Sequence, residues 1–492
     1  MITHSHISRK TSSRIIPAYL LSLLFVLGLL TGIKCPVFAD GVDITQEFTD
    51  EKFRAAVCRI LGKEQIFDTD VSGIIALDIA DQNISNLSGL EFFTGLEQLD
   101  CKYNDLTSLD TGSNLNLEYL DCSNNRPLAS LDISGNAKLK WLNCGGTKLN
   151  RLDVDNNTVL EFLECAGLCL EEDRDTPLSL NLSSNPELLY LDCSANQLVS
   201  LDISSNTKLV ELICSFNELS ALNTSKNILL EELICDFNDL TVLDISNNTK
   251  LKVLNCSRNW LSALNLSNNI MLEEFWCSEN SLTSLDISSN IELNTLNLNK
   301  NWLTGLDTSR NVKLDRLECE ENLLTDIDFG NNPELRALFC RKNQLHSLDF
   351  NNNPQLIALD CADNQLVSLE LSNNFRLEFL DCSNNRLATL DLSNNTRLMQ
   401  LDCSNNRLTS LDLSNNTRLD FLDYSNNRLI GKPKGLSNNT RVVPGETFKL
   451  LDHPILFWVL ILSALVLITF FIRYVIVLIG KINKQEPENQ KK

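Results

Sequence analysis

The side chains best suited to chemistry in this sequence are cysteines and carboxylates that recur at a fixed spacing. The chain has 492 residues and 17 cysteines, and 14 of these share one register that repeats most often every 21 residues. A carboxylate often stands immediately before such a cysteine. Thiolates attack electrophiles and bind metals, and paired carboxylates exchange protons, so both columns are candidates for chemistry. The 14 positions are Cys101, Cys122, Cys144, Cys165, Cys193, Cys214, Cys235, Cys256, Cys277, Cys319, Cys340, Cys361, Cys382 and Cys403.

Composition and motifs argue against an enzyme. Only four histidines are present, so a catalytic or metal site built from clustered histidines is disfavoured. The chain has no G-x-S-x-G, H-E-x-x-H, P-loop or kinase signature. A hydrolase built on paired carboxylates stays open as an alternative, although a regular repeat offers no deep cleft to desolvate such a pair. We therefore expect no catalytic residues and no cofactor.

The cysteines belong to a repeat of the form L-x-x-L-x-C-x-x-N-x-L-x-x-L-D-x-S-x-N with a period of 21. The register runs from Ile79 to Tyr424 and comprises 17 turns. The segment L-x-L-x-C alternates at period two, which predicts a short strand with Leu and Cys pointing inward. The sequence therefore predicts a leucine-rich-repeat solenoid over 74–429. We expect parallel strands on its concave side and extended or 3-10 segments on its convex side.

Neighbouring cysteines of the column could form disulfides or remain free thiols. In-register Cβ atoms of parallel strands lie near the strand spacing of about 4.8 Å, whereas a disulfide needs about 3.8 Å. We predict buried free thiols that act as small apolar residues, with no bound metal. The Asn three residues after the register position, as at Asn104, Asn125, Asn196 and Asn427, is expected to turn the chain and to bond backbone groups of the next turn.

Acidic residues outside the strands have a structural and a metal-binding interpretation. Asp68, Asp70 and Ser72 match the start of a calcium loop, but position 12 falls on Ile79, where a glutamate is needed. A turn and helix cap is the favoured interpretation. The carboxylates of the L-D-x-S-x-N segment are interpreted in the same way, as stabilisers of the return turns; they are Asp110, Asp132, Asp202 and Asp412.

Both ends of the chain read as membrane signals. Residues 1–39 combine three early basic residues, an apolar stretch and a small-x-small site, which predicts a secretory signal peptide. Residues 454–479 are long and apolar enough for one transmembrane helix, and lysines follow them in a predicted cytoplasmic tail, 480–492. We expect a helical N-terminal cap at 40–73, a juxtamembrane stalk at 430–453, and a single-pass membrane protein with its N-terminal part outside the cell.

The negative net charge indicates which classes of partner the protein can bind. The chain carries −22 overall, and both predicted membrane ends are basic, so the exported part is more acidic still. Nucleic acid is excluded as the main partner, and anionic surfaces are disfavoured. An extracellular protein with a basic patch, or a surface glycan, is expected instead.

One face of the predicted sheet stands out as a binding surface. The position three before Cys carries four successive aromatic residues, and the position just before Cys carries carboxylates. Aromatic rings offer contact area at low entropy cost, and carboxylates add orientation. Cross-strand stabilisation of the sheet is the alternative interpretation. The candidate binding residues are Tyr119, Trp141, Phe162, Tyr190, Asp100, Asp121, Glu164 and Asp192. A seven-residue insertion between Leu170 and Leu178, which contains the acidic segment 171–175, interrupts the period beside them.

The segments Glu47–Val57 and Leu61–Lys63 resemble the helical cap of bacterial internalin-like surface proteins, and Leu77–Ile79 with Ile84–Glu91 resembles their first repeat. This resemblance implies a cell-surface binding solenoid, often an adhesin. The chain departs from the family in its 21-residue period with Cys and in the absence of an L-P-x-T-G motif. A structural spacer or surface coat remains the first alternative function.

Overall fold

The computed structural model describes residues 41–167, 178–437 and 439–442, all within one compact unit. The predicted signal peptide, transmembrane helix and cytoplasmic tail lie outside the described residues, as does the insertion 171–175. Across the described ranges, no helix combines the length and apolar character that crossing a bilayer requires.

A small helical cap covers the first turn of the array. It consists of η1 (Thr45–Glu47), α2 (Glu51–Leu61) and α3 (Asp68–Val71). The carboxylate of Asp50 accepts two backbone N–H groups of the first turn of α2, and Gly62 ends the helix in the left-handed conformation. The helix buries Phe53 against Phe48 and Phe93, so the end of the solenoid core is closed by aromatic packing.

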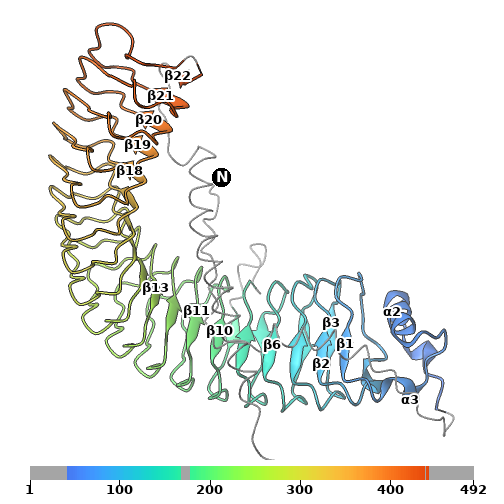
Figure 1. The fold of residues 1–492 in the computed structure, drawn as a ribbon. Coiled ribbons are helices and arrows are strands. Elements are labelled where there is room, and N and C mark those ends of the chain that lie inside the picture. The colour runs from blue at the N-terminus through green and yellow to red at the C-terminus, as the bar shows by residue number, and fades with distance from the viewer. Residues whose placement is uncertain (1–40, 168–177, 438, 443–492) are drawn as a thin grey trace, which may run out of the picture. The chain divides into compact units, whose positions relative to one another are not determined.

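Eighteen parallel strands form one sheet, and the turns that carry them stack along a curved path (Figure 1). Each strand pairs in register with its neighbours, so equivalent positions of successive repeats lie side by side. The strands are β1 (Ala76–Asp78), β2 (Gln98–Asp100), β4 (Tyr119–Asp121), β6 (Trp141–Asn143), β8 (Phe162–Glu164), β10 (Tyr190–Asp192), β11 (Glu211–Ile213), β12 (Glu232–Ile234), β13 (Val253–Asn255), β14 (Glu274–Trp276), β15 (Thr295–Asn297), β16 (Arg316–Glu318), β17 (Ala337–Phe339), β18 (Ala358–Asp360), β19 (Phe379–Asp381), β20 (Gln400–Asp402), β21 (Phe421–Asp423) and β22 (Arg441–Val442).

The return segments are tighter than a helix allows. Two pairs of short strands extend the first turns, β3 (Ser108–Asp110) with β5 (Ser130–Asp132), and β7 (Arg151–Leu152) with β9 (Ser179–Leu180). Later turns use consecutive tight turns, and η2 (Leu90–Phe92) is the one 3-10 helix on the return side of the described repeats. The prediction of extended segments is therefore confirmed for the first turns, whereas a 3-10 helix occurs at η2 alone.

Asparagine side chains join the turns on the strand side. Asn125 donates to the carbonyls of Cys101 and Cys122 at 3.0 and 2.9 Å, and its Oδ1 accepts the N–H of Leu106 at 3.0 Å. The bonded groups belong to its own turn and to the preceding one, not to the next turn as predicted. The loop that Asn125 closes packs against the loop of the preceding turn, so its side chain reaches Cys101 and Leu106 of that turn.

A second column of asparagines, which we did not predict, forms hydrogen bonds between turns on the return side. Asn136 donates to the carbonyls of Thr111 and Asn114 at 3.2 and 2.9 Å, and the same pattern recurs as far as Asn416. Each of these amides is buried. Since buried carbonyls need donors, the two columns explain why Asn recurs at two positions of most repeats, and Thr147 takes the strand-side place after Cys144.

The last turn is covered by the chain segment that follows it. β22 pairs with β21, and Lys434 exchanges backbone hydrogen bonds with Leu411 and Leu413 at 2.9 and 2.8 Å. The described part of the predicted stalk, 430–453, therefore packs on the last turn of the array. The carbonyls and N–H groups of β21 are thereby kept from forming an open edge.

Candidate functional site

The cysteine column forms a ladder of buried thiols through the core. All 14 ladder cysteines are free and fully buried, and the described Cys58 is free and half-buried. Burial raises the pKa of the Cys101 thiol well above its usual value, and Asp121 adds to the effect. Because the thiolate is the reactive form, burial disfavours nucleophilic and redox chemistry at this thiol. The prediction of apolar packing thiols is confirmed; Cys169 lies outside the described residues.

The four predicted aromatic residues lie on adjacent strands and stack face to face. The ring centroids of Tyr119 and Trp141 are 4.2 Å apart, those of Trp141 and Phe162 4.7 Å, and those of Phe162 and Tyr190 4.3 Å, with interplanar angles of 12° or less. Trp141 and Tyr190 are 9% and 5% exposed, while Tyr119 and Phe162 are half-buried. We call these four residues the aromatic stripe. Its stacking supports the sheet, in agreement with the alternative interpretation, and leaves ring edges at the surface.

One polar group of the aromatic stripe has no internal partner. The Nε1 donor of Trp141 is buried and makes no hydrogen bond to any described residue. A buried indole N–H normally finds an acceptor. The aromatic stripe therefore contains one buried donor that has no acceptor among the described residues.

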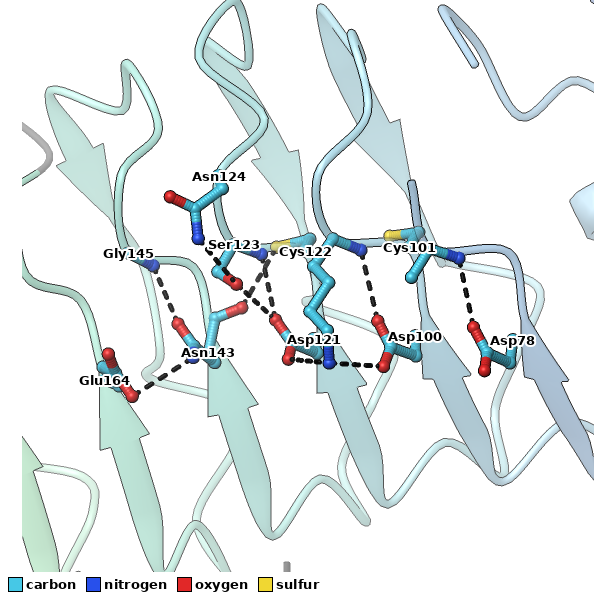
Figure 2. Close-up of polar contacts among 12 residues, drawn as sticks. Asp78, Asp100, Cys101, Asp121, Cys122, Ser123, Asn124, Asn143, Gly145 and Glu164 are labelled. Carbon is cyan, nitrogen blue, oxygen red and sulfur yellow. Dashed lines mark hydrogen bonds and ion pairs between the residues drawn. The ribbon is translucent and has the colours of Figure 1, made fainter. Parts of the chain in front are cut away.

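The four predicted carboxylates lie beside the aromatic stripe, and Figure 2 shows three of them. Asp100 and Asp121 share the ammonium of Lys102, at 2.8 and 3.4 Å. Asp121 also accepts the Ser123 hydroxyl at 2.7 Å, so it holds the loop that follows its strand. Burial raises the pKa of Asp100, whereas the bond from Lys102 acts in the opposite direction. These carboxylates are thus partly engaged within the protein.

Farther along the same column the partners become amides and hydroxyls. Asn143 donates from Nδ2 to Glu164 at 3.1 Å, and its Oδ1 accepts the N–H of Gly145 at 3.0 Å (Figure 2). Asp192 accepts from the backbone and the hydroxyl of Ser194. All eight predicted residues therefore lie on one face of five neighbouring strands, from β2 to β10.

A second aromatic pair in the middle of the array was not predicted. Phe216 and Phe237 stack at 4.1 Å, and the guanidinium of Arg258 lies 4.3 Å from the Phe237 ring. Arg258 in turn pairs with Glu279 at 2.9 Å. These residues all stand two positions after a cysteine register position, where the backbone φ is positive. The sequence contains a signal for this pair, because Phe216 and Phe237 occupy the same position of successive repeats.

Carboxylates line the strand face near the end of the array as well. Asp360, Asp381, Asp402 and Asp423 occupy the position before the register residue on β18 to β21, and all four are buried. Burial raises the pKa of Asp381 to about 6 and that of Asp402 to about 7, and neighbouring carboxylates add to the effect at Asp402. This block holds fewer negative charges at neutral pH than its composition indicates.

The acidic residues of the helical cap and of the return segments hold turns and helix ends. Asp68 accepts the N–H of Val42 at 2.9 Å, and Asp70 accepts the N–H of Phe67 at 3.1 Å and pairs with Lys63. On the return side, Asp132 accepts the N–H of Ser134 at 3.0 Å. Throughout the described part of the chain, no group of three or more His, Cys, Asp or Glu side chains is arranged to hold a metal ion.

Comparison with known proteins gives close counterparts for this arrangement. The functional domain of InlJ from Listeria monocytogenes, a structure that includes a cysteine ladder, is 30% identical, with a TM-score of 0.65 over 84% of each chain. InlF, an internalin of L. monocytogenes, is 20% identical, with a TM-score of 0.55 over 71% of this chain and 100% of its own. A leucine-rich-repeat protein of Leptospira interrogans is 21% identical, with a TM-score of 0.60 over 76% and 97%. The last two likenesses concern the fold alone. No family model and no curated protein matches the chain.

Proposed function

Because the chain belongs to the internalin-like leucine-rich-repeat proteins, we propose that it is a recognition protein that binds its partner on the inner face of β2 to β10. Proteins of this fold commonly serve in recognition rather than catalysis. The single observation that carries the assignment of the face is Trp141. Its buried indole N–H lacks an acceptor within the described protein, and a partner that lies across the aromatic stripe would supply one.

The chemistry of this face suits a protein with a basic patch or a surface glycan. The exposed edges of Tyr119 and Phe162 offer flat apolar contact, and the carboxylates of Asp100 and Glu164 are half-buried. A cationic side chain would meet the carboxylates beside the ring edges. A glycan would lie against the ring edges and donate hydroxyls to the carboxylates.

The proposed setting is the outside of a bacterial cell. The support is sequence alone: a signal peptide over 1–39, one membrane-spanning helix over 454–479 and basic residues after it. In this arrangement the repeat array forms an adhesion ectodomain anchored by a single helix.

A structural spacer or surface coat is the second candidate. The stacking of the aromatic stripe favours it, because stacked rings stabilise the sheet without any partner. The carboxylate-based hydrolase is the third. The ion pairs of Asp100 and Asp121 with Lys102 argue against a hydrolase, because both carboxylates are held in a structural contact.

The test uses the full-length chain in detergent on arrays of extracellular proteins and surface glycans, at two salt concentrations. Trp141→Phe keeps the stacked ring but removes the N–H, and Trp276→Phe makes the same change on β14, outside the stripe. We expect Trp141→Phe to weaken specific binding roughly fivefold or more, since an acceptor left unpaired costs about 1–3 kcal/mol. Trp276→Phe should bind like the unmodified chain.

Equal binding by all three chains would move the site away from the stripe. No specific binding under any condition would favour the spacer. Substrate turnover that disappears with one carboxylate variant would favour the hydrolase.

A further inference from the structure

The last three full turns carry six exposed arginines. Over the described ranges, none of the six forms an ion pair or a side-chain hydrogen bond with another residue. They form two columns, one before the strands and one after them. The first column is Arg376, Arg397 and Arg418, and the second is Arg386, Arg407 and Arg428.

Elsewhere on the array, cations at other positions of the repeat have partners on the adjacent turn. Lys252 pairs with Glu231 of the preceding turn at 2.8 Å, and Lys342 pairs with Glu321 of the preceding turn at 2.9 Å. Arg336 pairs with Asp315 one turn earlier. These three cations each face an opposite charge on the adjacent turn, whereas the final turns place like charges next to one another.

The second column repeats one tetrapeptide, Ser-Asn-Asn-Arg, in three consecutive turns. The N–H of each arginine donates to a leucine carbonyl of the preceding turn at 2.8 or 2.9 Å, so the three backbones are held identically. Because β19, β20 and β21 pair in register, the three arginine Cα atoms are spaced by about the strand distance, roughly 4.8 Å. The asparagine two residues before each arginine has a φ of 54° and lies beside this column.

We propose that the column of Arg386, Arg407 and Arg428 binds a linear anionic polymer that carries phosphate groups at regular intervals. Three guanidinium groups at this spacing repel one another, and phosphates between them would remove the repulsion and form charge-assisted hydrogen bonds. A thin polymer can follow one edge of the array. A broad anionic surface would also face the rest of the molecule, and the full chain carries a net charge of −22.

Binding of long-chain inorganic polyphosphate to the full-length chain in detergent tests the proposal over a range of salt concentrations. The site variant is R386Q/R407Q/R428Q, and the matched control is R376Q/R397Q/R418Q, which removes the same charge from the same turns. We expect the site variant to lower the slope of log K against log salt by about 2, since each lost contact with a single-stranded polyanion removes about 0.7. The control should leave the slope within about 0.5 of the unmodified value.

Thermal unfolding of both variants keeps the comparison interpretable, because all six side chains are exposed and neither variant should lower the unfolding temperature. Equal losses of binding in the two variants would reduce the effect to net charge and overturn the proposal. Failure of the unmodified chain to bind polyphosphate would also overturn it. Arginine-dependent preference for phosphatidylglycerol over phosphatidylcholine vesicles, without polyphosphate binding, would assign the column to a membrane and contradict a linear ligand.

Discussion

Two stretches of the strand face, β2 to β10 and β18 to β21, place carboxylates at the same position of the repeat and surround them differently. In the first stretch, Lys102 reaches both Asp100 and Asp121. In the second, the pKa of Asp402 is raised by burial and by neighbouring aspartates, and Arg341 lies 3.7 Å from Asp381. The repeat sets where a side chain stands, whereas the residues on adjacent turns decide its charge.

The aromatic positions differ between the two stretches as well. The first has four aromatic residues in successive turns, stacked without interruption. In the second, Gln400 separates Phe379 from Phe421 on neighbouring strands. Continuous stacking is therefore a property of the first stretch, and this difference leads to the largest expected effect.

Trp141→Ala should destabilise the array more than Phe379→Ala. Trp141 packs against rings on both neighbouring strands, so its removal opens a gap within the stack. We expect a loss of about 3–5 kcal/mol in the free energy of unfolding for Trp141→Ala, and a smaller loss for Phe379→Ala. Chemical denaturation measures both. Equal losses would show that stacking contributes nothing beyond burial.

Removing an asparagine of the strand-side column should lower the free energy of unfolding equally in the two stretches. Asn125 and Asn406 each donate to two cysteine-register carbonyls, and both are buried. Replacing either with Ala leaves buried carbonyls without donors, which predicts a loss of about 2–4 kcal/mol in each case. Asn394→Ala is the control, because its amide is exposed and water replaces the lost bond. Unequal losses at Asn125 and Asn406 would mean that the turns are not equivalent in backbone support.

The stretch β18 to β21 should make the stability of the protein depend on pH, because it contains buried aspartates with raised pKa values. Burial raises the pKa values of Asp381 and Asp402 from the ordinary 3.8 to about 6 and about 7 in the folded protein. A raised pKa means that folding favours the protonated form. The free energy of unfolding should therefore fall by several kcal/mol as pH rises from about 4 to about 7, since each unit of raised pKa corresponds to about 1.4 kcal/mol.

Asp402→Asn should flatten this dependence and stabilise the protein above pH 7. Asp391→Asn serves as its control, because hydrogen bonds from Ser393 lower the pKa of that exposed carboxyl and give the opposite sign. Thermal unfolding between pH 4 and 8 measures both variants. A dependence left unchanged by Asp402→Asn would contradict the role of this carboxylate.

The repeat predicted most of the fold, because hydrophobic period and turn chemistry act locally. Inward Leu and Cys, 17 turns and the capping role of Asp68 and Asp70 all follow from spacing within one or two repeats. The contact of Lys102 with Asp121 joins different turns at a distance set by packing, so the sequence showed the two residues but not their pairing. The burial of Trp141 depends on rings from adjacent strands, and β22 depends on a segment that lacks the repeat pattern altogether.

The most direct test of the recognition face is hydroxyl-radical footprinting of the full-length chain with and without its partner, once the arrays have provided one. Tyr119 and Phe162 have accessible ring edges within the aromatic stripe, whereas Trp260 and Trp302 are 63% and 57% exposed outside it. We expect the partner to reduce labelling of Tyr119 and Phe162 and to leave Trp260 and Trp302 unchanged. Protection of Trp260 and Trp302, with Tyr119 and Phe162 still labelled as in the free chain, would contradict the proposed face.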